Sequence, residues 1–391
     1  MNELVNRRLR VAMLAGEASG DLLGSHLLAA LKSRFPHLSA FGIGGPKMQQ
    51  QGLDVWYPME QLAVRGYVEV LRSLPKLLRL RGELKRRLIR ERPDIFIGID
   101  SPDFNLELER KLRSAGITTV QYVSPTIWAW RGERIHKIKR AVDKVLALFP
   151  FEAPIYQRAG IPVAYVGHPL ADELPEFPDH EGTREQLKIP SGVSVVALLP
   201  GSRQSEVRQM SELMIATALR IREQIPDVHF LVPLVSRETR TIFEDALYQQ
   251  DAEDLPLTIL FGHAHEAMTA ADTTLVASGT ATLEAALLKC AMVVTYTMPA
   301  LSAWIMRRKG YLPYVGLPNI IAGEFIVPEL LQEDALPENL AQAVCNLLRS
   351  PRLRARLQER FHSMHMDLRQ GTAERAVDAL EPLLAAKVNN R

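Results

Sequence analysis

RVAMLAGEASGDLLGSHLLAAL (residues 10–31) is the most informative segment for the architecture of this chain. After Arg10 comes the short apolar run Val11–Ala15, a turn with two glycines follows over Gly16–Gly20, and the remainder has a helical pattern. A strand that leads through a glycine turn into a helix is the opening unit of a doubly wound α/β domain. Further apolar runs lack alternation, which predicts parallel strands covered on both faces; they lie at 95–99, 118–122 and 145–148.

A second α/β series begins at 193–199, after a segment rich in proline, glycine and acidic residues. We therefore expect two Rossmann-like parallel-sheet domains facing each other across a cleft, because open α/β sheets bind ligands at the carboxyl ends of their strands. Such a pair also serves dehydrogenases, epimerases and binding proteins, so the fold class alone does not give the function. The expected boundaries are an N-terminal domain over 1–170, a linker over 171–190, a second domain over 191–345 and a helical tail over 346–391.

The composition excludes several classes of protein. A chain of 391 residues exceeds one ordinary core, and a formal net charge of +2 gives no indication of nucleic-acid binding. The two cysteines, Cys290 and Cys345, form no CxxC or Cys/His cluster, so we expect neither a structural zinc site nor a disulfide scaffold. No apolar stretch approaches the roughly 20 residues that cross a bilayer, so any membrane contact is expected to be peripheral.

The first glycine turn places Glu17 and Ser19 at a helix start, where their side chains would face a ligand. Its spacing is GxxxGxxxG and not GxGxxG, which disfavours a dinucleotide site. The alternative is that Ser19 or Asp21 only caps the helix.

Asp100 follows the strongly apolar run 95–99, so we expect it at the carboxyl edge of the first sheet. Transfer of a sugar to a hydroxyl group needs a base that accepts the proton, and a carboxylate with a pKa raised by apolar surroundings can do this. The alternative is that Asp100 only caps a turn, although Asp103 is the better capping candidate.

Trp128 and Arg131, with Trp130 between them, follow another predicted strand. Tryptophan rings form apolar walls with one polar tip. The segment is therefore either a wall of the acceptor site or a hydrophobic plug between helices.

Two loops of the second domain have the pattern strand, glycine turn and helix. In the first, the helix-start amides near Gly201, Ser202 and Arg203 could hold a diphosphate, and the guanidinium could stabilise the leaving group. In the second, Ser278, Gly279 and Thr280 precede Glu284, whose carboxylate could accept both hydroxyls of a ribose. Helix capping is the alternative in both loops. A third loop places Asn319 as a weaker candidate near the same ligand.

The segment 64–92 concentrates ten lysines and arginines and only three acidic residues, a local charge of +7 in a nearly neutral chain. A basic amphipathic stretch can lie on an anionic membrane, although an ordinary core-facing helix with a solvated basic face is the alternative. The predicted membrane-facing residues are Val68, Leu71, Arg72, Leu74, Lys76 and Leu77.

Seven motifs, spread in order over both domains, together resemble the lipid A disaccharide synthase family. They are AGEASGD (15–21), GIGGPKM (42–48), SPDFN (101–105), YVSPTIWAWR (122–131), LPGSR (199–203) with Glu206, SGTATLEAAL (278–287) and GLPNIIAG (316–323).

The resemblance implies a GT-B fold and an inverting transfer that needs no metal and no cofactor. It implies UDP-2,3-diacylglucosamine as donor, 2,3-diacylglucosamine 1-phosphate (lipid X) as acceptor, and lipid A disaccharide 1-phosphate and UDP as products. It matches Asp100 to the proposed catalytic base, and places Ser202, Arg203, Glu206 and Glu284 near UDP. It also implies a peripheral position on the cytoplasmic face of the inner membrane and a homodimer with exchanged C-terminal segments. The rival functions are another UDP-N-acetylglucosamine transferase, an epimerase or a non-catalytic nucleotide-binding protein.

Overall fold

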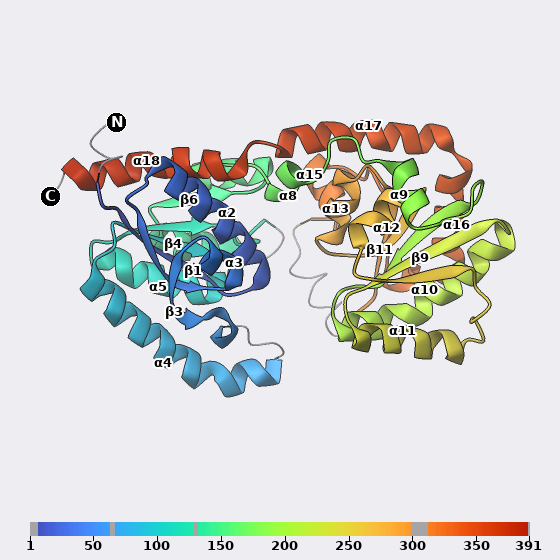
Figure 1. The fold of residues 1–391 in the computed structure, drawn as a ribbon, viewed down its shortest axis with the longest axis horizontal. Helices are drawn as coiled ribbons and strands as arrows, with labels where there is room; N and C mark the ends of the chain where they lie inside the picture. Colours follow the sequence, from blue (N-terminus) through green and yellow to red (C-terminus); the bar gives the residue numbers. More distant parts are fainter. Residues whose placement is uncertain (1–6, 63–66, 129–131, 299–311, 390–391) are drawn as a thin grey trace. The chain divides into compact units, whose positions relative to one another are not determined.

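A computed structural model describes residues 7–62, 67–128, 132–298 and 312–389. The chain divides into two compact units, of which one comprises Met1–Asp172 with Leu368–Arg391 and the other Glu173–Asp367. Each unit is built around its own parallel sheet, which confirms the predicted α/β class (Figure 1).

The first unit holds a seven-stranded parallel sheet in the order β3-β2-β1-β4-β5-β6-β7. The order reverses at β1 and β4, which lie side by side, and this reversal point is where doubly wound sheets bind ligands. The strands are β1 (Arg10–Ala15), β2 (Ser39–Gly44), β3 (Leu53–Pro58), β4 (Ile95–Ile99), β5 (Thr118–Tyr122), β6 (Lys144–Ala147) and β7 (Val163–Tyr165).

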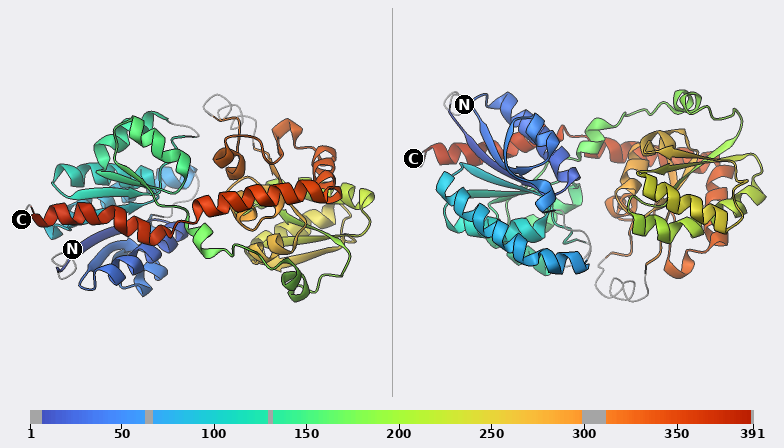
Figure 2. Two further views of the ribbon diagram at one scale, coloured as in Figure 1. Left: turned by 90° about the horizontal axis from the view of Figure 1, so that it is seen from above. Right: turned by 60° about the horizontal axis from the view of Figure 1, so that its bottom comes forward.

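Helices cover both faces of this sheet, as the continuous apolar runs predict (Figures 1 and 2). On one face, β1 packs against α2 and α18 through a core that includes Met13, Leu27 and Leu380. On the other face, Leu14 packs with Leu84 of α4 and neighbouring residues of α5. The helices of this unit are α2 (Ala18–Arg34), α3 (Pro46–Gln50), α4 (Tyr67–Glu91), α5 (Pro102–Ser114), α6 (Ile135–Ala141), α7 (Ala153–Arg158), α8 (Pro169–Glu173) and α18 (Thr372–Asn389).

The C-terminal helix α18 returns to the first unit and packs beside α2. Its apolar face, including Val377 and Leu384, is buried in the α2 side of the core. Arg34 at the end of α2 adds ion pairs with Asp378 at 3.1 Å and Glu381 at 3.2 Å. Because exposed ion pairs contribute little, the buried apolar face supplies most of the stabilisation.

The second unit holds a six-stranded parallel sheet in the order β10-β9-β8-β11-β12-β13. Its strands are β8 (Ser194–Leu199), β9 (Val228–Leu234), β10 (Leu257–Phe261), β11 (Thr273–Ala277), β12 (Ala291–Tyr296) and β13 (Glu329–Leu331). Its helices are α9 (His180–Gln186), α10 (Gln204–Gln224), α11 (Arg237–Gln249), α12 (Ala264–Ala270), α13 (Ala281–Leu287), α15 (Leu317–Ala322), α16 (Pro337–Arg349) and α17 (Pro351–Leu368). The order reverses between β8 and β11, and the loops after these strands carry the predicted diphosphate and ribose residues.

Candidate active site

Asp100 lies in a constrained turn immediately after β4. Asp100 and Ser101 both adopt left-handed backbone conformations, with φ of 52° and 44°. Residues with side chains rarely adopt this conformation, and such strain persists only where the surroundings hold it. Here the Asp100 amide donates to the Tyr122 carbonyl at 2.9 Å, and the Asp100 carbonyl accepts from Asn105 Nδ2 at 2.8 Å and Gln121 Nε2 at 3.0 Å. The backbone that carries the predicted base is therefore fixed.

The Asp100 carboxyl is partly buried, and its surroundings disfavour the charged form relative to a solvated aspartate. Burial raises its pKa above the ordinary value, a hydrogen bond from the Ser101 backbone lowers it, and the negative charge of Glu17 raises it. A carboxylate of this kind accepts a proton more readily than a solvated aspartate.

The β1 loop lies against the Asp100 turn, at the point where the strand order reverses. A Cβ placed on Gly16 would lie 2.7 Å from Ser101 Oγ, so the two loops touch because residue 16 has no side chain. Glu17 and Ser19 are exposed at the start of α2. The N-cap of α2 is Glu17, and no side chain caps the helix, so Ser19 is not the capping residue. Glu17 and Asp100 thus share one edge of the sheet.

Asp21 has a role that the sequence did not indicate. Its side chain is 2% exposed and accepts hydrogen bonds from the amides of Gly45 at 2.8 Å, Lys47 at 3.0 Å and Met48 at 3.0 Å. Asp21 therefore caps the start of α3 and not its own helix. This contact joins the first turn of α2 to the loop after β2.

Asp103 was predicted as the cap of α5, and this prediction is wrong. The helix begins at Pro102 with Ser101 as its N-cap, which places Asp103 in the first turn. Its carboxylate instead pairs with Arg134 Nη2 at 2.6 Å.

Trp128 is anchored at the edge of the first sheet. Its Nε1 donates to Glu152 Oε1 at 3.1 Å, and its ring packs edge-on against Phe151 with the ring centroids 5.3 Å apart. Burial raises the pKa of Glu152 to about 7, although hydrogen bonds from Phe149, Ser124 and Trp128 oppose this. These contacts resemble those of a structural plug, although the Trp128 side chain is only half-buried. Arg131 lies outside the described residues.

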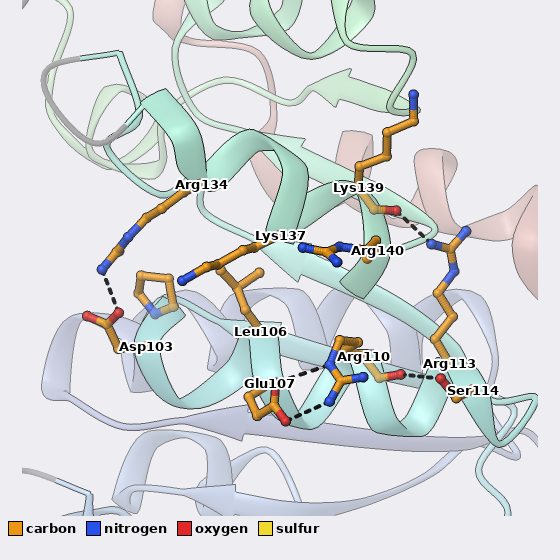
Figure 3. Close-up of a pocket in the computed structure, with 11 residues that line it drawn as sticks. Asp103, Leu106, Glu107, Arg110, Arg113, Ser114, Arg134, Lys137, Lys139 and Arg140 are labelled. Carbon is orange, nitrogen blue, oxygen red and sulfur yellow. Dashed lines mark hydrogen bonds and ion pairs between the residues drawn. The ribbon is translucent and has the colours of Figure 1, made fainter.

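A basic groove of about 670 Å³ runs between α5 and α6, and its lining begins at Pro102 (Figure 3). Three arginines of the lining already form ion pairs. Arg134 pairs with Asp103 and Arg110 with Glu107, both within the lining, whereas Arg113 pairs with Asp143, which is not a lining residue. The groove is therefore a surface of partly paired charges that begins next to the Asp100 turn.

In the second unit, the loop after β8 is closed by Glu206. Gly201 has a φ of 122°, and a Cβ there would lie 2.6 Å from the Glu206 Cβ, so only glycine fits. Glu206 Oε2 accepts hydrogen bonds from the amides of Ser202 at 3.2 Å and Arg203 at 3.3 Å. The helix-start amides predicted to hold a diphosphate are therefore bonded to a carboxylate, which a diphosphate would have to displace. The Arg203 side chain is 75% exposed and pairs with Glu206 Oε1 at 3.1 Å.

Glu284 projects from α13, after the loop formed by Ser278, Gly279 and Thr280. Gly279 and Thr280 are exposed, and the space around Gly279 is open. Glu284 Oε2 lies 3.1 Å from His265 Nε2, and the Glu284 carboxylate raises the pKa of His265. The carboxylate is thus held by a neighbour while its second oxygen can accept from a ligand.

Asn319 is fully buried and organises the loop around it. Its amide nitrogen donates to the Val327 carbonyl at 2.9 Å and to Glu329 Oε1 at 2.7 Å, and its oxygen accepts from the amides of Ile326 and Val327. These four bonds use the hydrogen-bonding capacity of the side chain. In this structure the amide therefore has no free hydrogen-bonding capacity for the expected contact with a nucleotide.

The predicted membrane-facing residues lie on the first half of α4. Leu74 and Lys76 are exposed and Leu77 is half-buried, whereas Leu80, Leu84 and Leu88 farther along the helix face the core. The side chains of Val68, Leu71 and Arg72 lie outside the described part of the structure.

Among the described residues, no helix is both long and apolar enough to cross a membrane. Within the same ranges, no group of three or more histidine, cysteine, aspartate or glutamate side chains could hold a metal ion.

Comparisons with known proteins show the family and the fold of this chain. The model of a family described as lipid-A-disaccharide synthetase matches residues 11–382. A lipid-A-disaccharide synthase of Methylobacillus flagellatus is 59% identical over 370 residues, which cover 95% of this chain and 98% of that protein. A glycosyltransferase structure from Rickettsia africae ESF-5 matches with a TM-score of 0.59 at 13% identity, over 99% of this chain and 100% of that one. Acinetobacter baumannii MurG matches with a TM-score of 0.59 at 16% identity, over 96% and 99% of the two chains. These structural matches confirm the predicted GT-B fold.

Proposed function

Because the chain belongs to the lipid-A-disaccharide synthetase family, it is a UDP-sugar-dependent glycosyltransferase of lipid A biosynthesis, and we propose its substrates and mechanism from that premise. The donor is UDP-2,3-diacylglucosamine and the acceptor is lipid X. The C6 hydroxyl of the acceptor attacks the anomeric carbon of the donor from the face opposite UDP. The new C–O bond forms as the bond to the diphosphate breaks, which inverts the anomeric configuration and releases UDP.

Asp100 acts as the general base and takes the proton of the attacking hydroxyl. The observation that carries this assignment is its position at the reversal point of the first sheet, with a pKa raised by burial and by Glu17. The left-handed turn holds the carboxylate in place before the substrate arrives, which reduces the cost of orienting it. Glu17 and Ser19, exposed beside it, line the path of the acceptor.

Arg203 neutralises the charge that develops on the departing UDP. Its exposed guanidinium pairs with Glu206 at 3.1 Å, and it can exchange this partner for a diphosphate with two parallel hydrogen bonds. The charge that a metal ion would otherwise supply then comes from this side chain and from the amides of the loop. Ser202 and Gly201 allow the diphosphate to approach the backbone.

Glu284 accepts the ribose hydroxyls, and Ser278, Gly279 and Thr280 line the entrance to this position. Thr282 Oγ1 accepts from the Leu317 amide at 3.1 Å, so the ribose loop and the Asn319 loop are joined. Asn319 therefore contributes by shaping this wall.

The first half of α4 binds the anionic surface of the inner membrane, where both acylated substrates reside. Exposed Leu74 and Leu78 would enter the interface while Lys76 and Arg79 contact anionic headgroups.

A homodimer with exchanged C-terminal segments would reuse the contacts that α18 makes with α2 within one chain. Light scattering at several protein concentrations measures the oligomeric state. A monomer at every concentration would contradict the exchanged dimer.

The test of the activity is incubation with UDP-2,3-diacylglucosamine and lipid X, with the products read by mass spectrometry. The expected products are a tetraacyl disaccharide 1-phosphate and one UDP per disaccharide. An epimerase would turn over UDP-N-acetylglucosamine without an acceptor, and a non-catalytic nucleotide-binding protein would bind UDP without forming the disaccharide. Either result would replace the proposed reaction.

A further inference from the structure

A buried polar cluster lies next to the Asp100 turn and takes no part in the proposed reaction. It consists of Asn105 and Glu109 on α5 and Gln121 on β5, whose relative exposure is 0% in each case. Asn105 and Glu109 are four residues apart and so lie on one face of the helix. Charged side chains are rarely buried without a partner, so the presence of Glu109 here needs a physical reason.

Gly98 in β4 makes room for the cluster. A Cβ on Gly98 would clash with Glu109 Oε1 and would lie 3.0 Å from Asn105 Cγ. Gln121 is the partner of Gly98 in the neighbouring strand, so its side chain projects from the same face of the sheet. Because Gly98 has no side chain, the Glu109 carboxyl and the amides of Asn105 and Gln121 can pack together in one buried space.

The hydrogen bonds of this cluster do not balance if Glu109 is ionised. Asn105 Nδ2 and Gln121 Nε2 both donate to the Asp100 carbonyl, and neither donates to Glu109. Four buried oxygens then have no partner among the described residues: Asn105 Oδ1, Gln121 Oε1 and both carboxyl oxygens of Glu109. Four acceptors without a donor would each lose their hydration with no compensation.

Protonation of Glu109 supplies one donor for these four oxygens and removes the buried charge. Burial alone raises the pKa of Glu109 well above its usual range. A protonated carboxyl group has one O–H to donate, and both neighbouring amides present an unpaired oxygen.

We infer that Glu109 is a positioning residue, which stays neutral and donates its carboxyl proton to the amide oxygen of Asn105 or Gln121. This bond fixes the two amides whose N–H groups hold the Asp100 carbonyl. Gln121 Nε2 also donates to the carbonyl of Val123 at 3.2 Å, and Val123 itself has a φ of 75°. One neutral carboxyl therefore supports the strained turns after both β4 and β5. The inference rests on the proposed role of Asp100 as base.

Two substitutions separate this role from simple packing. Glu109→Gln keeps a neutral donor of the same shape, so kcat should stay within about threefold of the wild type. Glu109→Leu removes the donor but fills the space, so kcat should fall about 10- to 100-fold while the Kd for UDP, bound by the other unit, is unchanged. Glu107→Gln and Glu107→Leu, on the exposed face of the same helix, are the matched controls and should leave kcat unchanged.

Infrared difference spectroscopy measures the protonation state without reference to activity, and so remains decisive if the leucine variant fails to fold. The spectrum of the wild type minus Glu109→Gln at pH 8 should contain the C=O band of a neutral carboxylic acid. A carboxylate band in its place would overturn the inference. So would a Glu109→Gln variant as impaired as Glu109→Leu, or a folded Glu109→Leu variant with normal kcat. Because the band does not depend on Asp100, failure of the proposed base would be seen separately, in Asp100 variants.

Discussion

Arg203 and Glu206 form an ion pair across the first turn of α10, with Nη1 and Oε1 3.1 Å apart. The same carboxylate accepts from the amides of Ser202 and Arg203, so it occupies the position proposed for the diphosphate. Arg203→Ala should therefore weaken UDP binding about tenfold or more, because it removes a charged donor. Glu206→Gln should leave the loop intact and tighten UDP binding a few-fold, because it removes a competing negative charge.

Isothermal titration with UDP measures both effects. Arg222→Ala, which removes an exposed ion pair with Asp254 in the same unit, is the control and should bind UDP normally. Equal weakening by Arg203→Ala and Glu206→Gln would show that the carboxylate supports UDP binding and does not compete with it.

Asp21→Ala should destabilise the first unit. The substitution leaves the amides of Gly45, Lys47 and Met48 without their acceptor, and each buried donor left unpaired costs about 1–3 kcal/mol. We expect the free energy of unfolding, from urea denaturation followed by circular dichroism, to fall by at least about 2 kcal/mol. Asp54→Ala removes an exposed carboxylate that accepts only from Trp56 among the described residues, and should cost less than about 0.5 kcal/mol. Similar values for the two variants would refute the capping role of Asp21.

Substitutions on α4 should weaken binding to anionic vesicles. Leu74 and Leu78 are 44% and 49% exposed, so replacing both with serine removes apolar contact without disturbing the core. Flotation with vesicles that contain an anionic phospholipid should show a loss of bound protein, and Lys76→Glu should reduce binding further. Leu336→Ser, at a position 49% exposed in the second unit, is the matched control. Equal flotation with neutral and anionic vesicles would contradict the electrostatic part of this proposal.

Glu17→Gln should move the acid limb of the pH–kcat profile to lower pH. Asp100 must be ionised to accept a proton, so kcat rises with pH through its pKa. Burial is the larger cause of the raised pKa, and the Glu17 charge adds to it. Removal of that charge lowers the pKa of Asp100 but does not restore the ordinary value. Asp103→Asn removes a nearby carboxylate that does not contribute to this shift, and should leave the acid limb in place. An unshifted limb in Glu17→Gln would show that another group titrates.

The fold class could be predicted because apolar runs such as 95–99 are long enough, and the glycine turns regular enough, to indicate parallel strands. The position of Asp100 at a sheet edge followed from the same pattern. The roles of Asp21, Glu109 and Asn319 could not be predicted, because each depends on partners far away in the fold. In the sequence, Glu109 stands among charged residues and resembles an exposed helix position. Only the packing of α5 over Gly98 buries it.

Asn319 is the opposite case, because the sequence motif singles it out as a candidate ligand contact. The loop motif places this residue close to the other nucleotide-binding candidates, and an amide in such a loop is a reasonable ligand contact. Its burial and its four internal hydrogen bonds become visible only once β13 is in place. The sequence motif therefore identifies the loop as a candidate, whereas the structure shows what the Asn319 side chain does inside it.

The central claim is that Asp100 is the base, and kcat of Asp100→Asn tests it most directly. The asparagine keeps the shape and tolerates the left-handed turn but cannot accept the proton, so kcat should fall about 10²- to 10⁴-fold. The Kd for the UDP-sugar should be unchanged. Since the raised pKa means that the ionised carboxylate disfavours the folded state at neutral pH, the variant should also be at least as stable as the wild type. A normal kcat, or a loss explained entirely by weaker donor binding, would contradict the claim.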